Sequence, residues 1–125
     1  MARIPAPHKS PTADREREWQ WDGTDKMDQL IDRGGWDLVA KAHGWYEPAE
    51  DPAHDPPQEK GAYKLPHHEL IDGRLEVVWR GVVSAMTVLN GARGGIHVPD
   101  SDRKKIWDHL AEHYREFDEE PPELT

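Results

Sequence analysis

Apolar residues recur at helical spacing in two stretches of the second half of the chain. The first set consists of Val78, Val82, Ala85, Met86 and Leu89. The second set consists of Ile106, Leu110, Tyr114 and Phe117, and it follows capping and acidic residues at positions 99–102. Because each set falls on one side of an ideal helix, the pattern predicts helices over residues 78–90 and 100–118 that form a helical hairpin.

Shorter patterns come before this helical hairpin. The apolar spacing predicts two short N-terminal helices, over residues 25–32 and 36–43, each followed by glycine. Residues 62–71 have extended character, since Leu65 precedes a proline and is biased toward the β region. Asp72-Gly73 suits the two positive-φ positions of a type I′ turn and predicts a β-hairpin, against which we expect the helical hairpin to pack. The expected fold class is a small single α+β domain.

Three segments lie outside the expected core. Residues 1–18 combine prolines and alternating charges with almost no large apolar side chains, so we expect a disordered N-terminal arm. Residues 47–61 are rich in proline and acid, which is typical of a surface loop. Residues 119–125 form an acidic tail. The predicted domain is therefore residues 19–118.

Composition and charge narrow the class of protein. The 125 residues carry a formal net charge of -9, which opposes attraction to nucleic acid or to an anionic membrane. No apolar run reaches the ~20 residues that a membrane-spanning helix needs, and the first residues lack the apolar stretch of a secretion signal. With no cysteine, the chain forms neither disulfides nor a thiolate zinc site. These features predict an intracellular protein with no membrane partner.

Histidine is the residue type that offers candidate chemistry. His109 and His113 occur in the spacing H-x-x-E-H, which matches an inverted zinc-protease signature. The match is short, and Glu112 falls on the face of the helix that we expect to be exposed. His109 and His113 are therefore weak metal candidates, and we expect neither a metal nor another cofactor.

A second histidine pair, His67-His68, follows Pro66. Neighbouring residues on a regular strand point to opposite faces, so we expect the two rings not to share one ion. The structural interpretation is that one ring lies at the edge of the core and donates a hydrogen bond to a backbone carbonyl.

No arrangement of residues suggests an activated nucleophile, because the three serines fall in the arm, within a helix and at a helix cap. Residues 90–95 form a glycine-rich turn in which Arg93 offers a positive charge for an anion. The cluster Arg103-Lys104-Lys105 leaves a nucleic-acid-contacting helical module open as an alternative.

Several strings along the chain form a recognisable series. They are Ala62-Tyr63-Lys64-Leu65-Pro66-His67-His68, Asp72-Gly73, Val78-Trp79-Arg80-Gly81-Val82, residues 89–95, Asp102-Arg103, His109-Leu110 and His113-Tyr114-Arg115, with Trp19-Gln20-Trp21-Asp22 and His43-Gly44-Trp45 before them. Over residues 19–122 the series resembles a module of unassigned activity in tailed-phage and prophage proteins, often the C-terminal extension of head-maturation (prohead) proteases.

The resemblance implies a phage or prophage context and a role as an accessory to capsid assembly or maturation. It also implies a location in the cytoplasm of the bacterial host cell or in the virion. The protease domain that carries the catalytic serine and histidine in those proteins is absent from this chain. The resemblance therefore implies no peptidase activity.

We accordingly expect a non-enzymatic protein-interaction module with a protein partner, such as a phage head protein. The alternatives are a nucleic-acid-contacting helical module and, third, a metal-dependent hydrolase. The strand before the β-hairpin is expected at the edge of a small sheet, where another chain can add. The expected binding residues are Tyr63, Lys64, His67, His68 and Arg93.

Overall fold

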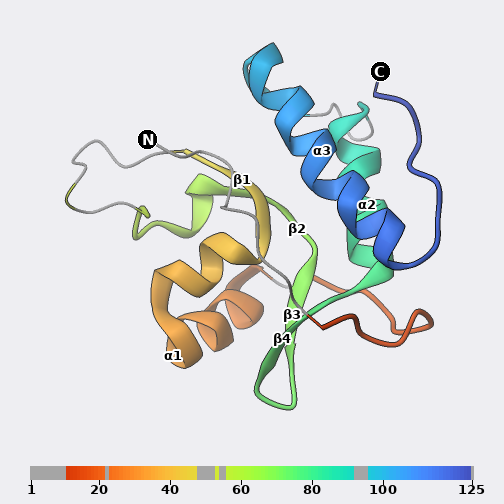
Figure 1. Cartoon of the computed structure of the whole chain (residues 1–125). Helices are drawn as coiled ribbons and strands as arrows, with labels where there is room; N and C mark the ends of the chain where they lie inside the picture. Colours follow the sequence, from red (N-terminus) through yellow and green to blue (C-terminus); the bar gives the residue numbers. More distant parts are fainter. Residues whose placement is uncertain (1–10, 22, 48–52, 54–55, 92–95, 125) are drawn as a thin grey trace.

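The computed structural model describes residues 11–21, 23–47, 53, 56–91 and 96–124. Its elements are α1 (Gly23–Lys41), β1 (His43–Tyr46), the 3-10 helix η2 (Lys60–Ala62), β2 (Tyr63–Pro66), β3 (His68–Ile71), β4 (Arg74–Val77), α2 (Trp79–Leu89) and α3 (Asp100–Glu116). In Figure 1, α2 and α3 lie side by side and the strands separate them from α1. The fold is α+β, as the sequence predicts. None of the helices in the described ranges is both long and apolar enough to cross a membrane.

The strands form two separate antiparallel pairs. β1 pairs with β2, and β3 pairs with β4 as a hairpin in which Leu70 faces Leu75. Asp72 and Gly73 connect β3 to β4 with φ angles of 53° and 79°, which confirms the predicted two-residue turn with two positive-φ positions. The predicted helical hairpin is also confirmed, because α2 contacts α3.

Two hydrophobic clusters fill the spaces between these layers. One lies between the α2–α3 hairpin and the strands, and its buried members are Trp45, Leu65, Val77, Val82, Ala85, Met86, Leu89, Ile106, Leu110 and Tyr114. The other lies between α1 and the strands, and its buried members are Met27, Leu30, Val39, Ala40, Ala42, Tyr46, Ala62 and Tyr63. The strands thus contribute side chains to both clusters.

The segment around β1 corrects the sequence-based prediction. The chain bends at Gly35, whose φ is 72°, as the predicted helix break requires, but the following helical turn ends at Lys41 instead of residue 43. Residues His43–Tyr46 form a strand that is buried along its whole length. A strand buried on both faces lacks the alternation that identifies strands in a sequence. α3 packs against β1, and α2 packs against β2. The helical hairpin therefore lies mainly on the β1–β2 pair and not on the predicted β-hairpin.

The N-terminal arm is also different from the prediction of disorder, over the part that the structure describes. The Ala13 amide donates to the Val77 carbonyl, the Val77 amide donates to the Pro11 carbonyl, and Ala13 is buried. The Arg17 guanidinium contacts the buried Glu69 carboxylate at 2.8 Å. Residues 11–17 therefore belong to the domain. They form backbone hydrogen bonds with the edge of β4, and Arg17 pairs with the buried charge of Glu69.

We predict that Arg17→Ala lowers the free energy of unfolding by about 1 kcal/mol, since it removes a hydrogen bond to a buried carboxylate that Lys26 still neutralises. Chemical denaturation measures the change. Glu18→Ala is the matched control, because Glu18 is the exposed neighbour, and it should stay within about 0.5 kcal/mol of the parent. Equal effects of the two substitutions would show that the arm does not pack as described.

His43 is a buried polar residue within the core around α1. Its Nδ1 lies 2.7 Å from the Val39 carbonyl, its Nε2 has no hydrogen-bond partner, and its ring lies against Trp21 and Tyr63. Burial lowers the pKa of His43 from 6.5 to about 4, and the hydrogen bond to Val39 only partly offsets this. As the pH falls, His43 therefore binds a proton near pH 6.5 in the unfolded chain, but only near pH 4 in the folded chain.

We predict that His43→Leu makes the domain less sensitive to acid. The stabilising effect of keeping His43 neutral is present above pH 6.5 and is lost as the pH falls toward 4. Between pH 7 and pH 5 the parent should lose about 2 kcal/mol of unfolding free energy more than His43→Leu does. Urea unfolding of both proteins at the two pH values tests this difference, and equal losses would contradict the burial of a neutral ring.

Candidate metal centre

Four histidine rings meet between the strands and α3. His67 lies between β2 and β3, His68 begins β3, and His109 and His113 lie on α3. The ring of His67 is 4.4 Å from that of His68, 5.2 Å from that of His109 and 5.0 Å from that of His113, measured between centroids. The ring of His113 in turn lies 5.3 Å from that of His68 and 5.0 Å from that of His109. We call these four residues the histidine cluster.

The backbone at the end of β2 brings His67 and His68 to the same place. Leu65 has a φ of 63°, a left-handed conformation that is unusual for a bulky residue, and β2 ends one residue later. His67 then stands outside both strands, with its amide donating to the Ala42 carbonyl and its carbonyl accepting from the Val78 amide. The expectation that His67 and His68 cannot approach one ion is wrong, because it assumed one regular strand.

Gly81 of α2 allows this junction to pack tightly. A Cβ atom at position 81 would lie 3.1 Å from the Cα of His67 and 3.0 Å from two ring atoms of Trp19. At such distances the neighbouring atoms of Trp19 and His67 would have to shift by a few tenths of an ångström to admit a Cβ atom. The absence of a side chain at Gly81 therefore lets α2 hold the backbone of His67 in place.

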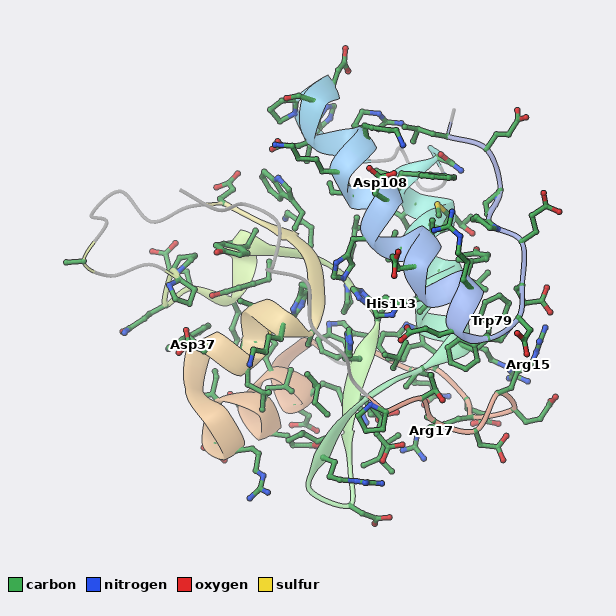
Figure 2. The ribbon with its side chains drawn as sticks, in the orientation of Figure 1. Arg15, Arg17, Asp37, Trp79, Asp108 and His113 are labelled. Carbon is green, nitrogen blue, oxygen red and sulfur yellow. The ribbon has the colours of Figure 1, made fainter. Side chains whose placement is uncertain are left out.

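The two remaining histidines come from one face of α3. His109 and His113 are four residues apart, so their rings are separated by one helical turn on the side of α3 that faces the strands. In Figure 2, His113 lies between α3 and the strands. Glu112 lies on the opposite side, where 77% of its side chain is exposed and Arg115 is 3.9 Å away. The H-x-x-E-H spacing is thus realised as two histidines without the carboxylate that a zinc protease uses.

Hydrogen bonds orient two of the rings with Nε2 toward the cluster. The Nδ1 of His67 lies 3.0 Å from the Leu65 carbonyl, and a carbonyl only accepts, so this nitrogen carries the proton. The Nδ1 of His113 contacts the carboxylate of Glu116 in the same way. In both rings Nε2 therefore faces the cluster. Such Nδ1 partners are typical of metal-binding histidines.

Burial keeps the central ring neutral. His67 is fully buried, and this desolvation, together with the neighbouring rings of His68, His109 and His113, holds the pKa of His67 well below its usual value. A neutral imidazole is the form that binds a transition metal. His68 and His113 are also buried, while His109 is half-buried at the edge of the cluster.

The spacing of the ring nitrogens fits a small transition-metal ion. The Nε2 atoms of His67 and His109 lie 3.3 Å apart, and one nitrogen from each of His67, His68 and His113 lies within 4.8 Å of the others. In a tetrahedral zinc site with bonds of about 2.0 to 2.1 Å, neighbouring ligand nitrogens are about 3.3 to 3.4 Å apart. The Nε2 of His113 is buried without a hydrogen-bond partner, as expected for a ligand atom that is positioned for a metal.

The sequence-based binding residues are only partly accessible. Tyr63 is buried and donates its hydroxyl to the Pro57 carbonyl, and His67 and His68 are buried in the cluster, so these three do not form an exposed strand edge. Lys64 is exposed, and Arg93 lies outside the described residues. The hydrogen bond from His67 to a backbone carbonyl confirms one structural prediction.

Glu116, the partner of His113, was not among the site residues predicted from the sequence. A carboxylate three residues after a histidine on a helix lies on the same side of that helix, so the spacing carried a signal. Its meaning depended on knowing that His113 faces inward. No family model, curated protein or solved structure matches this chain. The resemblance to a phage module therefore stays a prediction.

We predict that in the metal-free protein the Nδ1 atoms of His67 and His113 both carry a proton. The Nδ1–H tautomer is the minor one in free histidine, and here the Leu65 carbonyl and the Glu116 carboxylate select it. Nitrogen-15 NMR of the imidazole rings distinguishes the tautomers. Glu116→Ala should return His113 toward the Nε2–H form and leave His67 unchanged. An Nε2–H proton on His67 in the parent would contradict the described geometry.

Proposed function

We propose that this chain is a non-enzymatic protein-interaction module whose fold is fastened by one transition-metal ion, with zinc as the best fit. One observation carries the metal assignment: four histidine rings converge, and two of them are held with Nε2 facing inward. Neutral imidazoles suit zinc, copper, nickel and iron. Zinc has no geometric preference from its d-electrons and is usually bound by four ligands, and the 3.3 Å between the Nε2 atoms of His67 and His109 matches the ligand spacing of such a site.

Each ligand comes from a defined part of the fold. His67 and His113 would supply the oriented Nε2 atoms, and His68 would add a third ring from β3. His109 is the candidate for a fourth ligand, because its Nε2 lies 3.3 Å from that of His67. An ion there would connect the β2–β3 junction to α3. In the sequence these two segments are separated by β3, β4 and α2. A metal bound only in the folded state adds its binding free energy to the stability of the domain.

The surroundings of the cluster favour a structural role over hydrolysis. A metal hydrolase needs a carboxylate or another base beside a metal-bound water. Glu112, which would have this role in the protease signature, is exposed on the far side of α3. Glu116 reaches the cluster only through Nδ1 of His113. These positions support metal binding without catalysis.

The charge distribution favours a protein partner over nucleic acid. Lys104 belongs to the basic cluster at the start of α3, but its ammonium lies 2.6 Å from the Asp108 carboxylate and 4.7 Å from the centre of the Trp107 ring. Its charge is therefore partly neutralised, within a chain of net charge -9. The resemblance described above adds a phage or prophage head protein as the proposed partner.

The metal assignment predicts one zinc ion bound per chain. Protein purified without a histidine tag is stripped with EDTA and titrated with zinc by calorimetry. Zinc at 100 times its Kd should raise the free energy of unfolding by about 2.7 kcal/mol. His113→Leu should abolish binding, because it removes an oriented Nε2.

Two variants control for the other ways in which a histidine affects this assay. His43→Leu removes a buried histidine outside the cluster, and His97→Ala removes an exposed one. Both should keep one zinc site with unchanged affinity. The assignment is overturned if the parent binds no zinc, or if a folded His113→Leu chain binds zinc as tightly as the parent does.

A further inference from the structure

The C-terminal tail turns back along the helical hairpin. Asp118 has a φ of 57°, and the Glu119 amide donates to the Tyr114 carbonyl, which ends α3 and reverses the chain. In Figure 1, the chain after α3 then runs back beside α2 and α3. The sequence-based picture of a separate acidic tail is therefore incomplete, since residues 119–124 pack on the domain.

Side-chain donors hold the backbone of this tail. The Trp107 indole N–H donates to the Pro122 carbonyl at 2.8 Å, and the Asn90 side-chain amide donates to the Glu123 carbonyl at 3.0 Å. Leu124 packs against the hydrophobic cluster under α2 and α3. The Arg15 guanidinium contacts the Glu119 carboxylate. We call Arg15, Asn90 and Trp107 the tail-docking face.

The chain holds a second Pro-Pro segment by the same kind of contact. The Tyr63 hydroxyl donates to the carbonyl of Pro57, the second proline of Asp55-Pro56-Pro57, at 2.7 Å. Pro122 is likewise the second proline of Glu120-Pro121-Pro122. Consecutive prolines favour an extended helix with exposed carbonyls and little entropy to lose, so aromatic donors recognise them efficiently.

We propose that the tail-docking face is a binding site for an acidic peptide with two consecutive prolines, supplied by a partner protein, and that the chain's own tail covers it in the unbound state. This inference rests on the interaction role in the proposed function and identifies the surface and the chemistry of its partner. The Trp107 indole and the Asn90 amide would donate hydrogen bonds to backbone carbonyls of the peptide. An apolar residue after the prolines would pack beside α2, and Arg15 would pair with an acidic side chain.

The chain's own tail competes with a partner peptide for the tail-docking face, so the partner must bind more tightly than the tail does. Because the tail follows α3 directly, its effective concentration at the docking face is high, and a short peptide in trans competes poorly. A partner binds when it presents more contacts than the tail or when the tail is displaced. The face is thus protected until a suitable partner arrives.

The test uses the full-length chain with a weakened tail. In Pro122→Gly/Leu124→Ser the tail loses its stiff residue and its apolar contact, and circular dichroism checks that the domain remains folded. The probe is a synthetic peptide of residues 117–125, followed in NMR titrations through the side-chain amide signal of Asn90, which is present in every variant. The tail variant should bind it at least about tenfold more tightly than the parent, since the competing segment is weaker.

Matched controls separate specific docking from general adhesion. A peptide with both prolines replaced by alanine should bind more weakly, and Trp107→Phe in the tail variant should reduce affinity about fivefold to tenfold, because it keeps a ring and removes the donor. The proposal fails if the peptide does not bind the folded tail variant, or if neither control weakens binding. A concentration-dependent dimer of the parent that Trp107→Phe abolishes would make a second copy the occupant and overturn the assignment to a foreign partner.

The peptide and zinc experiments are independent of each other. The peptide contacts α2, α3 and the arm, whereas zinc is expected at the strand side of α3. A folded His113→Leu chain should lose zinc and keep the docking face. If the tail variant does not bind the peptide but the parent binds zinc, only the tail-docking proposal is rejected and the metal assignment stands.

Discussion

The backbone of His67 hydrogen-bonds to two distant parts of the chain at once. Its amide donates to the carbonyl of Ala42 at 3.0 Å, and its carbonyl accepts from the amide of Val78 at 3.1 Å. These bonds join the end of α1, both strand pairs and the start of α2 at one buried residue. An unmet backbone group there would cost about 1 to 3 kcal/mol. The positions of the other elements, and of the histidine rings, follow from this junction.

The histidine cluster replaces apolar packing at the centre of the fold with polar rings. Burial lowers the pKa of His67, and the buried Nε2 of His113 has no hydrogen-bond partner in the surrounding core. A metal ion would compensate these nitrogens and connect the junction at His67 to α3 through His113. The same arrangement keeps the candidate base Glu112 away, so the metal would strengthen the fold without exposing a reactive water.

Segments near the two chain ends complete the domain and meet beside α2. Arg15 lies 4.9 Å from the centre of the Trp79 ring and contacts Glu119 of the tail. Figure 2 labels Arg15 and Trp79 beside each other. The arm also adds to the edge of β4 and neutralises Glu69. Proline and charge in such segments limit burial of their side chains, but backbone hydrogen bonds and ion pairs still hold them. The tail thereby covers the part of the α2–α3 surface around Asn90 and Trp107.

Periodic apolar residues by themselves determined α2, α3 and the α+β class, and Asp72-Gly73 determined the hairpin turn, because spacing and φ preference are local properties. The fully buried β1 and the packed arm needed tertiary structure, since their hydrogen bonds go to residues far along the chain. The candidate site shows the same division. The i, i+4 spacing of His109 and His113 was visible in the sequence, whereas their meeting with His67 depended on the left-handed backbone at Leu65, which no local preference of leucine before proline predicts.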